Sequence, residues 1–300
     1  MKIAITGSTG LLGTALHDAW GETHVITRVI RGPREETVSV WDPRQDWVRP
    51  GALDGYDVVV HLAGASIGSG RWSAARKAEI VASRVAGTRT LVRHLASLEH
   101  KPSLFISASA VGFYGSRGDE VLTEESALGA GFLANLCKDW EAEARAAEQA
   151  GIRTAILRLG VILSRNGGAL GRMLLPFKLG AGGRIGSGKQ WMAWVGLEDA
   201  VRAFDFVVRA PGAQGVYNVT APNPATNAEF TKALGKTLKR PTLVPVPPFG
   251  LKLLLGGEMA QELILASQRV VPQRLGEAGF QFRQPRIADG LAAALGRGGG

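Results

Sequence analysis

Three glycines near the start of the chain have the spacing of a phosphate-binding turn. An apolar stretch of β type at residues 2–6 runs directly into these glycines. In such a turn the first glycine permits a sharp bend, the second lets the backbone approach a phosphate, and the third lets the new helix pack closely. Free N–H groups and the positive end of the helix dipole then face the anion. The spacing predicts a dinucleotide site rather than an ordinary βα turn. Its residues are Gly7, Ser8, Thr9, Gly10, Leu11, Leu12 and Gly13.

Two arginines stand where a dinucleotide site distinguishes NAD from NADP. At the end of the second strand, roughly 20 residues after the glycines, an acid would accept the ribose 2′-OH of NAD. This chain has HVITRVIRG there, with Arg28 and Arg31. Because a guanidinium can hold a 2′-phosphate with two hydrogen bonds, we expect NADP(H), with Arg31 favoured as the ligand. One of the two arginines could be only a surface residue, and Asp42 is a weaker candidate for the adenine side.

Small and hydroxyl-bearing residues follow two further strands. One set, after a strand at 57–62, would let ribose and diphosphate pass over the sheet edge. The other ends a strand at 103–108, at the carboxyl edge where open parallel sheets bind ligands. A hydroxyl there could donate a hydrogen bond to a substrate carbonyl. The two sets are Leu62, Ala63 and Gly64, and Ser107 and Ser109.

Strands and helices alternate through the first half of the chain. Strands separated by helical crossovers imply an α/β fold with a doubly wound parallel sheet of Rossmann type. The expected strands are 2–6, 24–30, 37–41, 57–62, 103–108 and 153–159, and the expected helices are 11–20, 73–97 and 134–150.

The second half is richer in glycine and proline and suggests a smaller unit. We expect residues 1–165 to form the NADP-binding domain, with 191–222 returning to it as a helix and a strand. Residues 166–190 and 223–300 would form a smaller C-terminal substrate-binding domain. A helix is expected up to residue 238, beginning at a cap on Thr226 or Asn227, and another near 249–266.

The composition excludes several classes of protein. Hydrophobic residues make up 45% of the chain and charged residues 20%, as in an ordinary globular protein. The five His and one Cys show no metal-ligand spacing, and no apolar run approaches the ~20 residues that span a bilayer. The net charge of +9 is spread along the chain, which does not favour nucleic acid as a partner. We expect a cytoplasmic protein.

Two other motifs fail on their context. GRIGSGK at 183–189 fits part of a triphosphate-binding loop, but Gln190 replaces the Ser or Thr that would hold magnesium. We expect a loop there, in which Lys189 could face an anionic substrate. GASIG at 64–68 fits a hydrolase nucleophile elbow, but the histidines after Ser66 cannot build a triad.

Several segments together resemble one known family. The glycine motif, LAG at 62–64, SASAVGFYG at 107–115, ASIGSGRW at 65–72 and VVPQRLGEAGFQFR at 270–283 resemble an atypical extended short-chain dehydrogenase/reductase. Members of that family are labelled NAD(P)-dependent epimerase/dehydratase or cell-division inhibitor-like. They carry a C-terminal domain of unknown function. The similarity runs from residue 2 to about residue 296.

The resemblance implies a catalytic set that this chain only partly has. The extended reductases use Tyr-x-x-x-Lys with a serine: the tyrosine transfers a proton, and the lysine lowers its pKa and holds the nicotinamide ribose. Ser109 matches the serine and Lys138 the lysine, but Ala134 stands in place of the tyrosine. Tyr114 is the candidate replacement, with a packing role as its alternative. Lys138 could itself act if burial lowers its pKa, although ribose binding is its commoner task. Cys137 is expected to be a buried apolar residue.

Candidate substrate ligands lie in the loops and at one strand end. Arginines beside aromatic residues would suit a ligand with an anionic part and a flat or sugar part. Each of these residues could instead serve packing or a salt bridge. The candidates are Arg71, Trp72, Arg158, Lys189 and Trp194, with Trp191 beside them.

These residues lead to two functional expectations. The first is an NADP(H)-dependent epimerase or reductase that acts on a small carbonyl, hydroxyl or sugar-nucleotide-like substrate. The alternative is a non-catalytic NADP(H)-binding redox sensor or partner-binding protein, which the missing tyrosine favours. We expect a monomer or a homodimer, the latter joined through helices 73–97 and 134–150.

Overall fold

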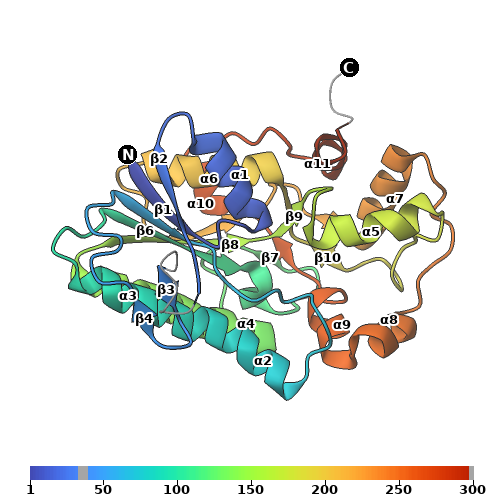
Figure 1. The fold of residues 1–300 in the computed structure, drawn as a ribbon. Coiled ribbons are helices and arrows are strands. Elements are labelled where there is room, and N and C mark those ends of the chain that lie inside the picture. The colour runs from blue at the N-terminus through green and yellow to red at the C-terminus, as the bar shows by residue number, and fades with distance from the viewer. Residues whose placement is uncertain (33–39, 297–300) are drawn as a thin grey trace.

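A six-stranded parallel sheet forms the centre of the computed structural model, which describes residues 1–32 and 40–296 (Figure 1). The spatial order is β12-β8-β6-β5-β1-β2, and each neighbouring pair is parallel. The doubly wound α/β sheet predicted from the sequence is confirmed. Its strands are β1 (Lys2–Thr6), β2 (Val25–Val29), β5 (Val58–His61), β6 (Leu104–Ala110), β8 (Arg153–Leu159) and β12 (Gly215–Val219).

Helices cover both faces of this sheet. Ile3 and Ile5 of β1 pack into a core with α1 (Leu11–Trp20) and α6 (Leu197–Arg209). Ala4, between them, packs into a second core with α3 (Gly87–Ser97) and α4 (Phe132–Arg145). Figure 1 shows α1 and α6 on one face, and α3 and α4 with α2 (Ala74–Val81) on the other. Nearly continuous apolar strands are typical of parallel sheets covered in this way.

The helix predicted at 73–97 is interrupted in the middle. Between α2 and α3, residues Ala82–Ala86 form a π-helical turn, η1. Single π turns are rare and are often found at functional sites.

The strand predicted at 37–41 lies largely outside the described residues. Trp41–Asp42 forms β3, which pairs antiparallel with β4 (Trp47–Val48) as a short hairpin. Arg31 makes one isolated bridge to Trp41.

The second half of the chain adds small strand pairs and short helices. β9 (Val161–Leu163) pairs with β11 (Trp194–Gly196), β10 (Trp191–Met192) with β13 (Ala225–Thr226), and β7 (Val121–Leu122) with β14 (Arg269–Val270). The remaining helices are η2 (Val111–Tyr114), η3 (Ala146–Ala150), α5 (Gly168–Lys178), α7 (Asn227–Leu238), α8 (Pro248–Leu255), α9 (Gly257–Leu263), α10 (Gln273–Glu277) and α11 (Ile287–Ala294). The sequence predicted the cap of α7 correctly: Thr226 accepts from Glu229 N, and Glu229 returns the bond.

A contact joins α9, in the C-terminal part of the chain, to α4, which covers the main sheet. The carboxylate of Glu262 in α9 accepts hydrogen bonds from Phe132 N and Leu133 N, both at 2.8 Å. It therefore satisfies backbone donors at the start of α4, where Gly131 has no side chain to do so. Within the described residues, no helix is both long enough and apolar enough to cross a bilayer.

Candidate cofactor site

The glycine turn joins β1 to α1 at the carboxyl edge of the sheet, and two of its glycines are required by space. Gly7 has φ +67°, and a Cβ there would lie 2.7 Å from the carbonyl carbon of Leu62. A Cβ on Gly13 would lie 2.4 Å from Gly7 O. Gly10 is exposed, and its N donates to Gly7 O at 3.0 Å, which closes the turn. The local spacing therefore produces the predicted strand–turn–helix shape.

The start of α1 is free to bind an anion. Its N-cap residue, Gly10, offers no side-chain hydrogen bond, and the first turn of the helix contains no acidic residue. The first N–H groups of the helix therefore keep their hydrogen-bonding capacity, and the helix dipole adds positive potential. Ser8 and Leu12 are buried supports of the turn, whereas Thr9 is exposed beside Gly10.

A buried histidine that the sequence analysis missed anchors this edge of the sheet. His61, at the end of β5, has Nδ1 2.7 Å from Thr6 Oγ1 and Nε2 3.0 Å from Thr88 Oγ1. Thr6 Oγ1 also accepts from Leu62 N and Ala63 N. Desolvation, with the Arg84 charge nearby, lowers the pKa of His61 to about 3, so the ring is neutral. In the sequence, the indication of this role was the position of the histidine directly before LAG at 62–64.

The two arginines proposed for the cofactor phosphate lie beside the turn. Val29 pairs with Thr6, so Arg31 lies just past the carboxyl end of β2, next to the glycines. Arg28 and Arg31 are both exposed, and neither has an ion-pair partner among the described residues. Asp42 is buried and its Oδ1 accepts from Arg44 N at 3.0 Å.

The candidate residues after β5 and at the end of β6 differ in their exposure to solvent. Leu62 and Ala63 lie against Gly7 and are partly exposed, and Gly64 is exposed. Ser107 is fully buried, and its Oγ donates to Ala108 O at 3.1 Å.

Ser109, Tyr114 and Arg158 belong to a buried polar network. Both carboxylate oxygens of Glu141 in α4 accept from Arg158, at 2.7 and 2.9 Å, and Ser109 Oγ donates to the same carboxylate at 2.7 Å. Arg158 also donates to Tyr114 Oη at 2.9 Å, and that hydroxyl donates to Asn218 Oδ1 at 2.7 Å.

This network corrects three predicted roles. Tyr114 is fully buried, its hydroxyl proton is committed to Asn218, and burial raises its pKa, so a packing role replaces that of proton donor. Arg158 is 3% exposed and is paired with Glu141, which makes it a structural cation rather than a substrate ligand. Ser109 is 1% exposed and hydrogen-bonds inward. Glu141, which binds Ser109 and Arg158, was missed because these partners lie on strands distant from it in the sequence.

Lys138 lies off the buried stripe of α4, and its role toward the cofactor stays a prediction. The buried stripe of α4 contains Ala134, Cys137 and Glu141, and Lys138 lies beyond it, exposed to solvent. Cys137 is buried as predicted, with Sγ 3.6 Å from Ala110 O, and burial raises its pKa to about 11. The inner face of α4 therefore carries neither the tyrosine nor the lysine of the extended reductases.

The candidate substrate residues separate into buried and accessible ones. Trp194 is fully buried, and its Nε1 donates to Asn223 O, so it belongs to the core and not to a ligand site. Trp72 is partly buried edge-on to Phe132. Lys189 is exposed, and Trp191 donates to Asp119 Oδ1 at 2.8 Å.

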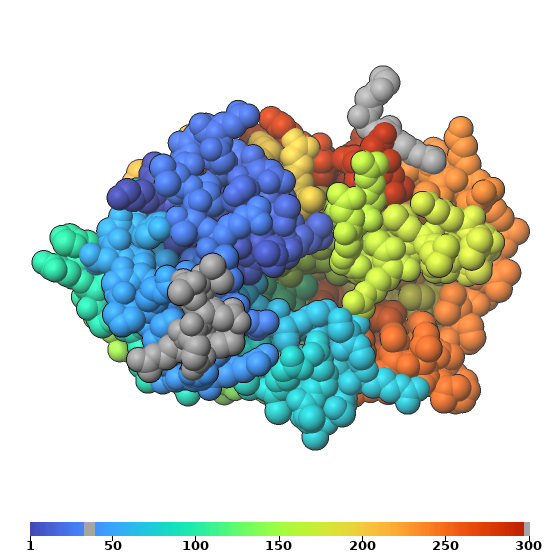
Figure 2. All heavy atoms as spheres, viewed as in Figure 1, coloured from blue at the N-terminus to red at the C-terminus, as the bar shows by residue number. Residues whose placement is uncertain are grey.

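The loop of residues 65–72 is hydrogen-bonded to both α8 and α5. Arg71 donates to the backbone of α8 at Leu253 and Leu254, and Arg172 of α5 donates to Gly68 O. Figure 2 shows a recess where the blue N-terminal segment, the cyan segment that includes this loop and the yellow-green α5 meet. The glycine turn is a neighbour of α5 as well, since a Cβ on Gly168 would lie 3.7 Å from Leu11 Cδ2.

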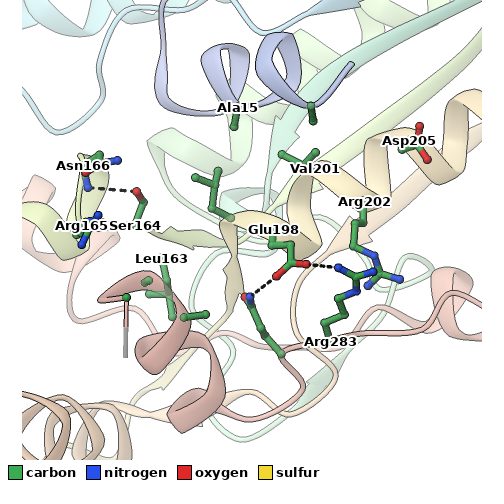
Figure 3. Close-up of a pocket in the computed structure, with 16 residues that line it drawn as sticks. Ala15, Leu163, Ser164, Arg165, Asn166, Glu198, Val201, Arg202, Asp205 and Arg283 are labelled. Carbon is green, nitrogen blue, oxygen red and sulfur yellow. Dashed lines mark hydrogen bonds and ion pairs between the residues drawn. The ribbon is translucent and has the colours of Figure 1, made fainter. Parts of the chain in front are cut away.

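A second hollow, of about 750 Å³, lies between α1, α6 and α11 (Figure 3). Ala15 lines it from α1, but no residue of the glycine turn does. Glu198 in its wall pairs with Arg283 and accepts from Gln284 Nε2, so both charged groups already have partners. We do not place the cofactor there.

The sequence matches known families over most of its length. Residues 3–220 match the NAD dependent epimerase/dehydratase family. The chain belongs to that family. Residues 246–294 match a domain of unknown function, DUF1731, which confirms the resemblance drawn from the motifs.

Relatives of the same length exist in bacteria and animals. An epimerase family protein of Mycobacterium bovis is 42% identical over 99% of this chain and 98% of its own length. The human epimerase family protein SDR39U1 is 34% identical over 97% of this chain and 98% of its own length.

Solved structures agree with the fold. The crystal structure of human SDR39U1 with NADPH has a TM-score of 0.89 and 31% identity, and the match covers 98% of this chain and 99% of that one. A nucleoside-diphosphate sugar epimerase of Corynebacterium glutamicum has a TM-score of 0.79 and 36% identity, and the match covers 99% of this chain but 58% of that one.

Proposed function

We propose that this protein binds NADP(H) at the glycine turn and acts as an epimerase or reductase on a small carbonyl, hydroxyl or sugar-nucleotide-like substrate. The observation that carries the proposal is the uncapped start of α1 beside two exposed arginines that have no ion-pair partner among the residues the structure describes. The structure of the human relative, which contains NADPH, supports the choice of cofactor.

Each part of the site would have a separate task. The N–H groups at Gly10–Gly13 would hold the diphosphate, and Arg31 would hold the 2′-phosphate. Leu62 and Ala63 would let the chain of the dinucleotide pass over β5. When bound, NADP(H) supplies or accepts a hydride. Arg71, Trp72 and Lys189 would contact an anionic substrate from the loops around the recess.

The inner face of α4 favours a second candidate function. With Ala134 and a buried Cys137 there, and with Tyr114 committed to the core, no side chain identified above is placed to transfer a proton. A redox sensor or partner-binding protein would need only to bind NADP(H). Whether the protein is a monomer or a homodimer stays a prediction.

Calorimetric titration with NADPH and NADH tests the cofactor assignment. The wild type is expected to prefer NADPH, and Arg31→Asp is expected to lose that preference; a variant that keeps it would contradict the phosphate assignment. A panel of carbonyl substrates, followed by nicotinamide absorbance, separates the two functions. Turnover supports the enzyme, and tight NADPH binding with no turnover supports the sensor.

A further inference from the structure

Arg84 is a buried cation that has no carboxylate partner in the described part of the chain. The residue is 8% exposed and lies in the π-helical turn η1. Its Nη1 donates to Ala65 O at 3.0 Å, but its buried Nε has no partner, and no carboxylate pairs with it within the described residues. Burial lowers its pKa to about 10, so it stays charged at neutral pH. A buried charge normally has a partner, as Arg158 has in Glu141.

The guanidinium of Arg84 lies against the segment that follows β5. A Cβ on Gly64 would be 2.9 Å from Arg84 Cζ and 3.0 Å from Nη2, so a side chain at position 64 would displace the guanidinium. The ring of Trp140 lies on another side, with its centroid 5.2 Å from Cζ. Nη2 makes no hydrogen bond to a residue that the structure describes.

The π turn itself holds this arrangement in place. Ser83 and Arg84 are adjacent in η1, and both bind Ala65: Ser83 Oγ accepts from Ala65 N at 3.0 Å, and Arg84 donates to Ala65 O. The irregular turn therefore brings two neighbouring side chains to the same residue of the loop.

The order of the strands indicates which half of the cofactor passes Gly64 and Arg84. Arg31 follows β2, the glycine turn follows β1, and Gly64 follows β5, in adjacent places along the carboxyl edge. A dinucleotide with its 2′-phosphate at Arg31 and its diphosphate at the turn continues over β5 with its nicotinamide half. We propose that Arg84 binds the nicotinamide-side phosphate and ribose of NADP(H). This inference rests on the proposed function and gives Arg84 a cationic task at the nicotinamide half of the cofactor.

Two ligands distinguish binding of the whole cofactor from binding of its adenosine half alone. NADPH contains both halves, whereas 2′,5′-ADP contains the adenosine, the 2′-phosphate and one 5′-phosphate. Arg84→Met is expected to raise the Kd for NADPH about tenfold or more, because a charge-assisted hydrogen bond is lost, and to leave the Kd for 2′,5′-ADP within about twofold. Arg84→Lys, which keeps the charge without the planar fork, is expected to lie between the two.

Arg76→Met is the matched control. Arg76 tethers the same loop by donating to Ser66 O, but it is paired with Glu79 and does not face Gly64. It is expected to bind both ligands like the wild type. Thermal unfolding of each variant establishes that it is folded. If Arg84→Met does not fold, the affinities of Arg84→Lys for the two ligands are compared with those of the wild type instead.

The outcomes are distinct. NADPH binding to Arg84→Met as tight as that of the wild type overturns the inference, and so does an equal loss for both ligands, which would indicate a general disturbance of the loop. If the wild type binds neither ligand, the proposed function fails, and the inference falls with it.

Discussion

Arg158 holds both carboxylate oxygens of Glu141, at 2.7 and 2.9 Å, inside the molecule, where the two side chains are 3% and 0% exposed. The pair joins the end of β8 to α4 directly behind the edge where ligands are expected. The network built on it thus uses the polar residues next to that edge for structure rather than for chemistry.

Removing Glu141 should therefore destabilise the protein strongly. Glu141→Ala leaves Arg158 charged and unpaired, and we expect a loss of about 3–5 kcal/mol in the free energy of unfolding, measured in urea. Glu143→Ala on the same helix is the control, since its pair with Arg89 is half-exposed and is expected to contribute less than ~1 kcal/mol. Equal losses in the two variants would contradict this account.

Tyr114→Phe separates a structural hydroxyl from a catalytic one. Asn218 Oδ1 and one Arg158 donor lose a partner, so we expect a loss of about 1–3 kcal/mol in unfolding free energy. Binding of NADPH, and any turnover that is found, should change by less than about twofold because the hydroxyl does not face a ligand. A fall in turnover of two orders of magnitude or more with unchanged binding would restore Tyr114 as proton donor.

Substitution of two glycines of the turn should have different effects, one on stability and the other on NADPH binding. Gly7→Ala places a side chain at φ +67° and against the backbone of Leu62, so we expect a loss of at least ~1–2 kcal/mol in stability. Gly10→Ala meets only Gly7 O at 3.3 Å, so the fold should survive while the added methyl hinders the diphosphate. Urea unfolding and NADPH titration measure the two effects. Tight NADPH binding by Gly10→Ala would argue against the turn as the phosphate site.

His61 should make stability depend on pH. Its folded pKa of about 3 lies below the ordinary value of 6.5, so between these values the unfolded chain binds more protons. Stability is therefore complete above pH 6.5 and falls as the pH drops toward 3, by up to about 1.4 kcal/mol per pH unit from this residue. His61→Gln lacks the titrating ring, so its unfolding free energy, measured from pH 4 to 7, should have a smaller slope. Identical slopes would show that His61 titrates normally.

The parts that could be predicted from sequence depend on neighbours in the chain. The glycine turn, the strands of the main sheet and the cap of α7 follow from residues within a few positions of one another, and the structure has them. Lys138 was placed by counting along a motif, but burial in a helix depends on which face meets the sheet, and Lys138 lies on the face of α4 that points to solvent.

The residues that were missed have partners far away in the sequence. Arg84 matters because of Gly64, and His61 because of Thr6 and Thr88, and these contacts exist only once the sheet is assembled. Trp194 resembled a loop aromatic in the sequence, yet it fills the core between α5, α7 and α11.

The hydrogen bonds from Phe132 N and Leu133 N to Glu262 also have a consequence for synthesis on the ribosome. The start of α4 must wait for a residue made 130 positions after Phe132 before its backbone donors are satisfied. Until then, water must bind these two donors. Exchanging the C-terminal segments of two relatives would therefore require an acid at the position of Glu262 in the incoming segment.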